Sequence, residues 1–228
     1  DEFELLYIGE GKMMTPSTAT VNAIQEIEHM GQLACDNLKL GMKTLCDPNE
    51  DEINVIYQKE RYINFLNHKI TDYLVKASEM EMPIADSQMV GALFHVVNDI
   101  ERIGDHAENL ADSAKMIRNG EAQLSDKAKQ QLQDMTEMVM EILDYSLDMF
   151  THNNQEHMQE ILDLEDAIDE KEKKLQRAHV KRLTKNRCTP EGGMIFSDTV
   201  SGLERVADHA TNIAFAIHQP DDYSDDDD

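Results

Sequence analysis

The 228-residue sequence contains no tryptophan, only six tyrosines and six phenylalanines, and only five prolines and ten glycines. Strand-rich domains need turn residues at short intervals and favour aromatic side chains, so this composition disfavours a sheet protein. The odd number of cysteines, Cys35, Cys46 and Cys188, with no Cys-x-x-Cys pair, favours reduced thiols over a disulfide framework. No run of about 18 apolar residues occurs, so no membrane-spanning helix is predicted.

Basic residues are also scarce. Lys and Arg number 21 against 46 Asp and Glu, which gives a net charge of −25, and only six of the acids follow Pro220. A field of this sign repels phosphate backbones and anionic lipid, so the sequence predicts no nucleic-acid binding and no direct membrane insertion. Cations and basic surfaces are the partners that this charge favours.

Apolar side chains recur three or four residues apart, which is the period of helices with one buried face. In the first such segment they are Ile24, Ile27, Gly31, Ala34, Leu38, Gly41 and Leu45. Thr15 followed by Pro16 suits the start of this helix. The same pattern predicts five more helices. The second covers residues 50–80 and the third residues 85–118; the fourth begins after a cap at Ser125, the fifth includes Ile168, and the sixth begins at Thr189.

The six predicted helices form two matched halves. Residues 101–111, ERIGDHAENLA, and residues 204–214, ERVADHATNIA, share seven identities in eleven positions. Because short connections make neighbouring helices antiparallel, we predict an all-α fold of two tandem antiparallel three-helix bundles, packed end to end or side by side. The predicted parts are an N-terminal lead-in (1–15), two repeats (16–120 and 121–219) and an acidic disordered tail (220–228).

Several of these helices carry acids three or four residues apart, which places them in one column on a single helix face. The acids spaced in this way are Glu101, Asp105, Glu108 and Asp112 in the third helix, Glu165 and Asp169 in the fifth, and Glu204 and Asp208 in the sixth. In the second helix Glu60 matches Glu165, but Asn64 stands where the pattern predicts Asp. The first-half set is therefore less complete.

Two interpretations of these acids are open. Carboxylate pairs on adjacent helices are suited to bridging two or more iron, manganese or zinc ions. The acids are alternatively a solvated face in a strongly acidic chain, which is the ordinary role of a charge run. Recurrence in both halves favours metal binding, although duplication alone also preserves a pattern.

A second pattern, Arg102, His106 and Asn109, recurs as Arg205, His209 and Asn212. These residues suit either the orientation of metal-binding carboxylates or a hydrogen-bond network between helices. The ferritin-like Glu-x-x-His pattern is not met, and there is no Gly-rich phosphate loop or nucleophile elbow. These absences weaken the alternative of a carboxylate-bridged metal enzyme, and a purely structural bundle whose acids only keep it soluble is a further alternative.

The duplicated unit and its two motifs resemble the PhoU family of phosphate-uptake regulators over residues 16–218. The resemblance implies a non-enzymatic regulatory domain with multinuclear iron or zinc clusters, manganese being possible, on its acidic motifs. It implies the metal ligands Glu60, Glu101, Asp105, Glu165, Asp169, Glu204 and Asp208.

The opening segment MMTPSTATVNAIQEIEHMGQLA is similar to that of the PhoU-type domain of bacterial sodium/phosphate cotransporters. Together with Asp1 in place of Met, this predicts a cytoplasmic domain cut from a transporter and tethered to the inner face of the cell membrane. Its expected partner is the membrane domain of the transporter or a phosphate-signalling protein, and a homodimer is possible. The alternative is a free-standing PhoU-type regulator that acts on a phosphate transporter and a signalling kinase.

Overall fold

A computed structural model describes residues 3–9, 11–12 and 14–217, and all regular structure in this part of the chain is helical. The helices are α1 (Pro16–Cys46), α2 (Glu50–Ser78), α3 (Ile84–Arg118), α4 (Asp126–His152), α5 (Met158–Thr184) and α6 (Pro190–Ala214). The all-α prediction of two three-helix bundles is confirmed. The predicted acidic tail lies outside the described residues.

Local side chains explain where the helices begin. Thr15 is the N-cap of α1 with Pro16 at its first position, as predicted. Ser125 and Thr189, the predicted caps of α4 and α6, accept hydrogen bonds from the backbone N–H groups of Ala128 and Gly192, each at 3.1 Å. Each cap satisfies an amide that has no partner within its own helix.

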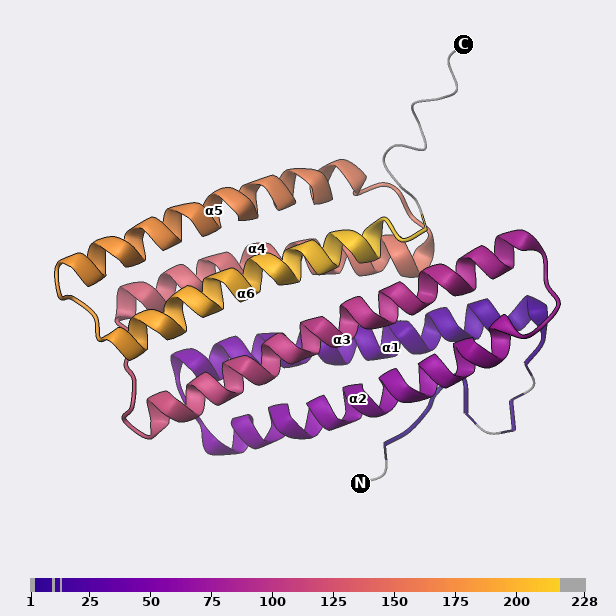
Figure 1. Ribbon diagram of the computed structural model, residues 1–228, viewed down its shortest axis with the longest axis horizontal. Coiled ribbons are helices and arrows are strands. Elements are labelled where there is room, and N and C mark those ends of the chain that lie inside the picture. Colours follow the sequence, from indigo (N-terminus) through magenta and orange to yellow (C-terminus); the bar gives the residue numbers. More distant parts are fainter. Residues whose placement is uncertain (1–2, 10, 13, 218–228) are drawn as a thin grey trace, which may run out of the picture.

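The two bundles lie side by side, with α2 and α5 on the outer sides and α1, α3, α4 and α6 at the seam (Figure 1). The main apolar core runs through both halves and includes Ile27 of α1 and Leu132 of α4, and a smaller buried cluster lies between α2 and α3. Helices α1 and α4 approach closely at Gly31, where an added Cβ would lie 3.1 Å from Leu147 Cδ2. Burial across this seam decides between the two predicted packings, because an end-to-end arrangement leaves those apolar faces in water.

The seam between α3 and α6 carries the repeated histidines. His209 of α6 and Asp99 of α3 form a hydrogen bond between Nδ1 and Oδ1 at 2.9 Å, and Asp99 is only 8% exposed. At the 103-residue offset of the two repeats, His106 corresponds to His209 and Gly202 corresponds to Asp99. His106 packs on Gly202, where an added Cβ would lie 3.0 Å from its Nδ1. The two crossings are therefore equivalent in position but differ in chemistry.

Replacement of His209 by alanine is expected to lower the free energy of unfolding by about 1–3 kcal/mol, because Asp99 stays buried and loses its hydrogen-bond partner. Urea unfolding measures the change. The control is His95→Ala, an exposed histidine on α3. Equal effects of the two substitutions would show that the contact across the seam contributes nothing specific.

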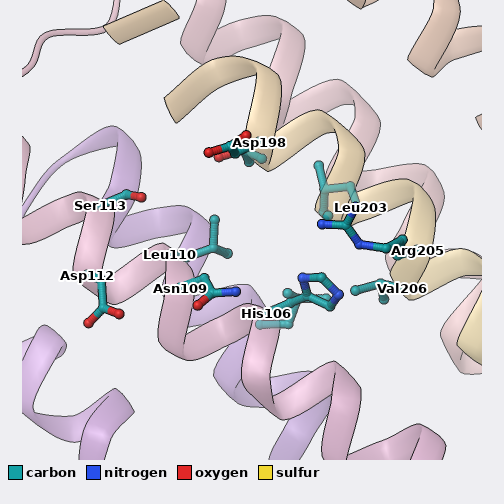
Figure 2. A pocket seen from close by; sticks show the side chains of 12 residues that line it. His106, Asn109, Leu110, Asp112, Ser113, Asp198, Leu203, Arg205 and Val206 are labelled. Atoms are coloured by element: carbon teal, nitrogen blue, oxygen red, sulfur yellow. The ribbon is translucent and has the colours of Figure 1, made fainter. Parts of the chain in front are cut away.

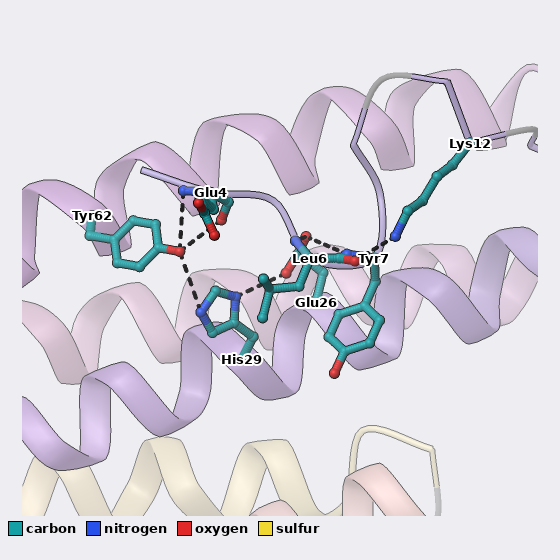
Figure 3. A network of polar contacts seen from close by, with 7 residues as sticks. All are labelled: Glu4, Leu6, Tyr7, Lys12, Glu26, His29 and Tyr62. Atoms are coloured by element: carbon teal, nitrogen blue, oxygen red, sulfur yellow. Dashed lines mark hydrogen bonds and ion pairs between the residues drawn. The ribbon is translucent and has the colours of Figure 1, made fainter. Parts of the chain in front are cut away.

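The N-terminal lead-in is held against the first bundle by a buried carboxylate (Figure 3). Glu26 of α1 is fully buried, and its Oε1 accepts hydrogen bonds from the backbone N–H groups of Leu6 (2.8 Å) and Tyr7 (3.1 Å). Its Oε2 lies 3.0 Å from His29 Nδ1. Tyr62 of α2 donates its hydroxyl to the Glu4 carbonyl at 2.7 Å. The lead-in is thus docked on α1 and α2.

Replacement of Glu26 by alanine is expected to release residues 3–9 and to destabilise the protein by about 1–3 kcal/mol, because the partly buried amides of Leu6 and Tyr7 lose the carboxylate that accepts their hydrogen bonds. Limited chymotrypsin digestion, which cuts after aromatic residues, detects the release as faster cleavage after Tyr7. Glu28→Ala on the same helix is the control. Unchanged cleavage of the Glu26 variant would mean that other contacts hold the lead-in.

Candidate metal centre

The first acidic cluster lies between α2 and α3. Carboxylate oxygens of Glu60, Asp105 and Glu108 all lie within 4.8 Å of one another. Glu60 is only 3% exposed, and neither of its carboxylate oxygens has a hydrogen-bond partner among the described residues. Burial first, and then the charges of Asp105, Glu108 and Glu101, raise its pKa from 4.5 to about 8. The cluster concentrates negative charge where water does not screen it.

A glycine makes room for this buried carboxylate. Gly104 of α3 faces Glu60, and a Cβ added there would lie 2.8 Å from Glu60 Oε2. The carboxylate therefore sits directly against the backbone of α3. Residue 207, at the equivalent place in α6, is alanine, so the second half does not offer the same space.

The second cluster lies between α5 and α6. Oxygens of Asp169, Glu172 and Glu204 lie within 4.8 Å of one another, and all three side chains are partly exposed. Burial, followed by the charge of Asp208, raises the pKa of Glu204 to about 8. Burial also raises the pKa of Glu172, with the charges of Asp169 and Asp208 acting in the same direction.

These residues fit bound metal ions. A buried carboxylate without a donor is unfavourable unless it is protonated or paired with a cation, and Glu60 has no described donor or cation partner. All the candidate ligand atoms in both clusters are carboxylate oxygens, which suit hard or borderline metal ions such as manganese, iron and zinc. The arrangement supports multinuclear binding because each carboxylate offers two oxygens.

A cavity of about 380 Å³ lies between α3 and α6 at one part of the seam (Figure 2). His106 and Arg205 line it, together with Asn109 and Asp198. Burial, and next the charge of Arg205, lowers the pKa of His106 to about 4. Because His209 pairs with Asp99 and His106 faces Gly202 and this cavity, the two imidazoles act in the contact between bundles. Of the repeated pattern, His209 fits the hydrogen-bond interpretation, whereas Arg102, whose Nε lies 4.0 Å from Glu101 Oε2, fits the orientation of a predicted ligand.

A family model described as the PhoU domain matches residues 27–114 and 132–217, which is most of the chain. This chain belongs to the PhoU family. It is 24% identical over 189 residues to the "phosphate-specific transport system accessory protein PhoU homolog 1" of Thermotoga maritima, with 82% of this chain and 81% of that protein covered. A PhoU homolog of Clostridium acetobutylicum is 25% identical over 190 residues, with 82% and 85% covered.

Solved PhoU structures share the fold. The crystal structure of PhoU from Pseudomonas aeruginosa superposes with a TM-score of 0.81 at 19% identity, over 89% of this chain and 97% of that one. The regulatory PhoU protein of the phosphate transport system from Streptococcus pneumoniae gives 0.76, also at 19% identity, over 89% and 95%. At this identity the likeness concerns the arrangement of the helices.

In this PhoU chain four of the seven predicted ligands fall in the two clusters: Glu60 and Asp105 in the first, and Asp169 and Glu204 in the second. The other three predicted ligands, Glu101, Glu165 and Asp208, lie outside these groups. Glu101 and Asp208 act as neighbouring charges, since Glu101 raises the pKa of Glu60 and Asp208 raises that of Glu204 after burial, while the pKa of Glu165 is itself raised by burial and by Asp208. The ligand set of seven stays a prediction.

Two cluster residues were not among the predicted ligands. Glu108 belongs to the acidic column of α3, and Glu172 follows Asp169 by three residues, which keeps it on the same face of α5. At the 105-residue offset, Glu172 corresponds to Asn67 and Asp169 to Asn64. The first half therefore draws two acids from its third helix, whereas the second half of this PhoU chain draws two from its middle helix.

Proposed function

We propose that this chain is a metal-binding regulator of phosphate uptake. The family and the printed names of its relatives, accessory proteins of phosphate-specific transport systems, support a role in phosphate transport. They support the free-standing regulator better than a cotransporter domain, which stays a prediction. The partners are a phosphate transporter and a phosphate-signalling kinase. Among the described residues, none of the helices has the length and the apolar character of a membrane span. From the relatives' role in phosphate transport, we place the site of action at the cytoplasmic face of the transporter.

The observation that carries the metal proposal is the buried carboxylate of Glu60. It faces Asp105 and Glu108 without a hydrogen-bond donor among the described residues, and a second carboxylate cluster lies between α5 and α6 of the other half. A generic solvated face has no reason to bury such a group, since burial of an unpaired charge is costly. A bound cation would pair with this carboxylate and remove the cost of burying it, which favours metal binding.

Iron, zinc or manganese bound at the two clusters supplies positive charge that neutralises several carboxylates. The surface of each bundle then changes by several charge units, and such a change alters how a protein docks on a partner. The fold positions these carboxylates. Gly104 leaves room for Glu60 against the backbone of α3, and the acids of α2 and α5 face those of α3 and α6. Homodimerisation through these surfaces is an open alternative to docking on the transporter. The named relatives are accessory proteins, so we propose no catalytic reaction.

Metal content by plasma mass spectrometry, on protein purified without chelators, tests the proposal. We expect two or more metal ions per chain. Glu60→Gln/Asp105→Asn should remove those of the first cluster, and Asp169→Asn/Glu204→Gln those of the second. The matched control is Glu137→Gln/Glu141→Gln, an exposed pair on α4 with the same four-residue spacing. Metal loss in the control, or no metal after reconstitution, would overturn the metal sites.

Phosphate uptake by cells that carry the same variants tests the regulatory step. The cluster variants should change uptake, whereas the α4 control should not. Loss of metal with unchanged uptake would separate the two parts of the proposal and leave a PhoU bundle that docks without the metal.

A further inference from the structure

One end of this acidic molecule is strongly basic. Residues 173–187, in the second half of α5 and the turn after it, contain seven Lys or Arg and no Asp or Glu. They hold a third of the 21 basic residues of the chain, and the rest of the sequence has a net charge of 14 − 46 = −32. The net charge of the whole chain therefore does not show that this segment is positively charged.

The basic segment lines a cavity of about 590 Å³ together with the start of α4. Seven of the ten lining residues are Lys or Arg, and none is acidic. Ser125, the N-cap of α4, also lines the cavity, so the first turn of a 27-residue helix begins there and adds partial positive charge. The size falls within the range of about 300–1,000 Å³ typical of small-molecule sites.

Arg182 is held rigidly at this cavity. Its Nη1 donates to Gln131 Oε1 at 3.0 Å, and its guanidinium carbon lies 4.5 Å from the centre of the Phe196 ring. These two contacts orient the guanidinium beside the cavity, and a planar guanidinium matches the geometry of phosphate oxygens.

Helix-end electrostatics alone does not account for the basic segment. Cations stabilise the C-terminal turn of a helix, but that effect falls off within one turn. These cations extend over several turns, from Lys173 to beyond the end of α5 at Thr184. None of them forms an ion pair within 4.0 Å in the described part of the chain, despite its many acids. An anion bound among them would relieve their mutual repulsion.

We propose that this cavity binds a small polyanion with several linked phosphate groups, of the nucleoside triphosphate or inorganic oligophosphate class. The charge and volume of the cavity exceed what a single inorganic phosphate ion requires. Arg182 supplies an oriented positive charge at the wall of the cavity, and exposed lysines such as Lys181 and Lys185 supply the surrounding charge. This site lies on residues separate from the acidic clusters and does not rest on the proposed metal binding.

Isothermal titration of chelator-treated protein with tripolyphosphate tests the proposal, because removal of metal excludes phosphate binding through the acidic clusters. At about 0.15 M ionic strength we expect saturable binding of one tripolyphosphate per chain, tighter than that of inorganic phosphate. Lys181→Glu/Lys185→Glu should weaken binding roughly tenfold or more. The control Lys39→Glu/Lys76→Glu makes the same charge change at exposed residues of α1 and α2.

Absence of saturable binding by the wild-type protein would overturn the proposal. So would equal weakening in the control, which would assign binding to overall charge. Flotation with vesicles that contain phosphatidylglycerol tests whether this surface binds lipid instead. Vesicle binding that depends on Lys181 and Lys185, without tripolyphosphate binding, would overturn the small-ligand site. Retention of the metal sites in the Lys181→Glu/Lys185→Glu protein keeps the two proposals distinguishable.

Discussion

Glu60→Gln is expected to stabilise the metal-free protein and to abolish metal-dependent stabilisation at the first cluster. Glu60 is buried, unpaired and close to Asp105 and Glu108, so the neutral amide removes both the desolvation cost and the repulsion. The folded metal-free protein must either protonate this carboxylate or bury its charge, and the amide avoids both costs. At neutral pH the substitution should therefore raise the unfolding free energy of the metal-free form by about 1–3 kcal/mol. A metal ligand that stabilises the holo form therefore destabilises the apo form.

Thermal unfolding with and without excess metal measures both effects. Metal bound only by the native state at about 100 times its Kd stabilises it by about 2.7 kcal/mol, and Glu60→Gln should lose this increment at its own cluster. Glu137→Gln on α4 is the control, since that carboxylate is exposed. A less stable metal-free Glu60→Gln protein, or an unchanged metal increment, would contradict the assignment.

The metal-free protein is expected to lose stability as the pH rises from 5 to 8. The folded-state pKa values of Glu60 and Glu204 are raised from 4.5 to about 8, so the native state holds protons that the unfolded state has released. Stability linked to such groups is present below the unfolded-state pKa and is lost as the pH rises through the folded-state value. For Glu60 alone the loss is about 3 kcal/mol over this interval.

Metal should reverse this dependence, because carboxylates bind metal only when deprotonated and the affinity rises with pH. Urea unfolding of chelator-treated protein at several pH values gives the profile. The Glu60→Gln protein should show a shallower decline, reduced by the contribution of that residue. A flat profile for the wild-type protein would mean that these carboxylates are ionised in the folded state without cost.

The helices themselves were predictable from local signals. Thr15 with Pro16, Ser125 and Thr189 mark the starts of three helices, and the apolar spacing of three and four residues marks the buried faces. The duplication was visible in the ERIGDHAENLA and ERVADHATNIA segments and predicts two equal bundles. These features depend on backbone capping and on the period of the helix, which nearby residues determine.

The composition of the acidic clusters was only partly predictable. Spacing identifies the acids that share a helix face, but not the acids of the next helix that they meet. The pairing of Glu60 with Asp105 and Glu108 depends on the rotation of α2 against α3 and on the space left by Gly104. Glu172 joins Asp169 and Glu204 because α5 presents that turn to α6. Carboxylate contacts of this kind arise only from helix packing.

The sequence by itself determined the six helices and several of their starts, the duplicated halves, the acidic faces and the family resemblance. Tertiary structure alone decided that the bundles lie side by side, because that packing buries the remaining apolar faces of α1, α3, α4 and α6. It also placed His209 against Asp99 and His106 against Gly202, and it joined the basic end of α5 to the start of α4 in one cavity. Interactions between residues far apart in the chain depend on the positions of whole helices, which no local pattern specifies.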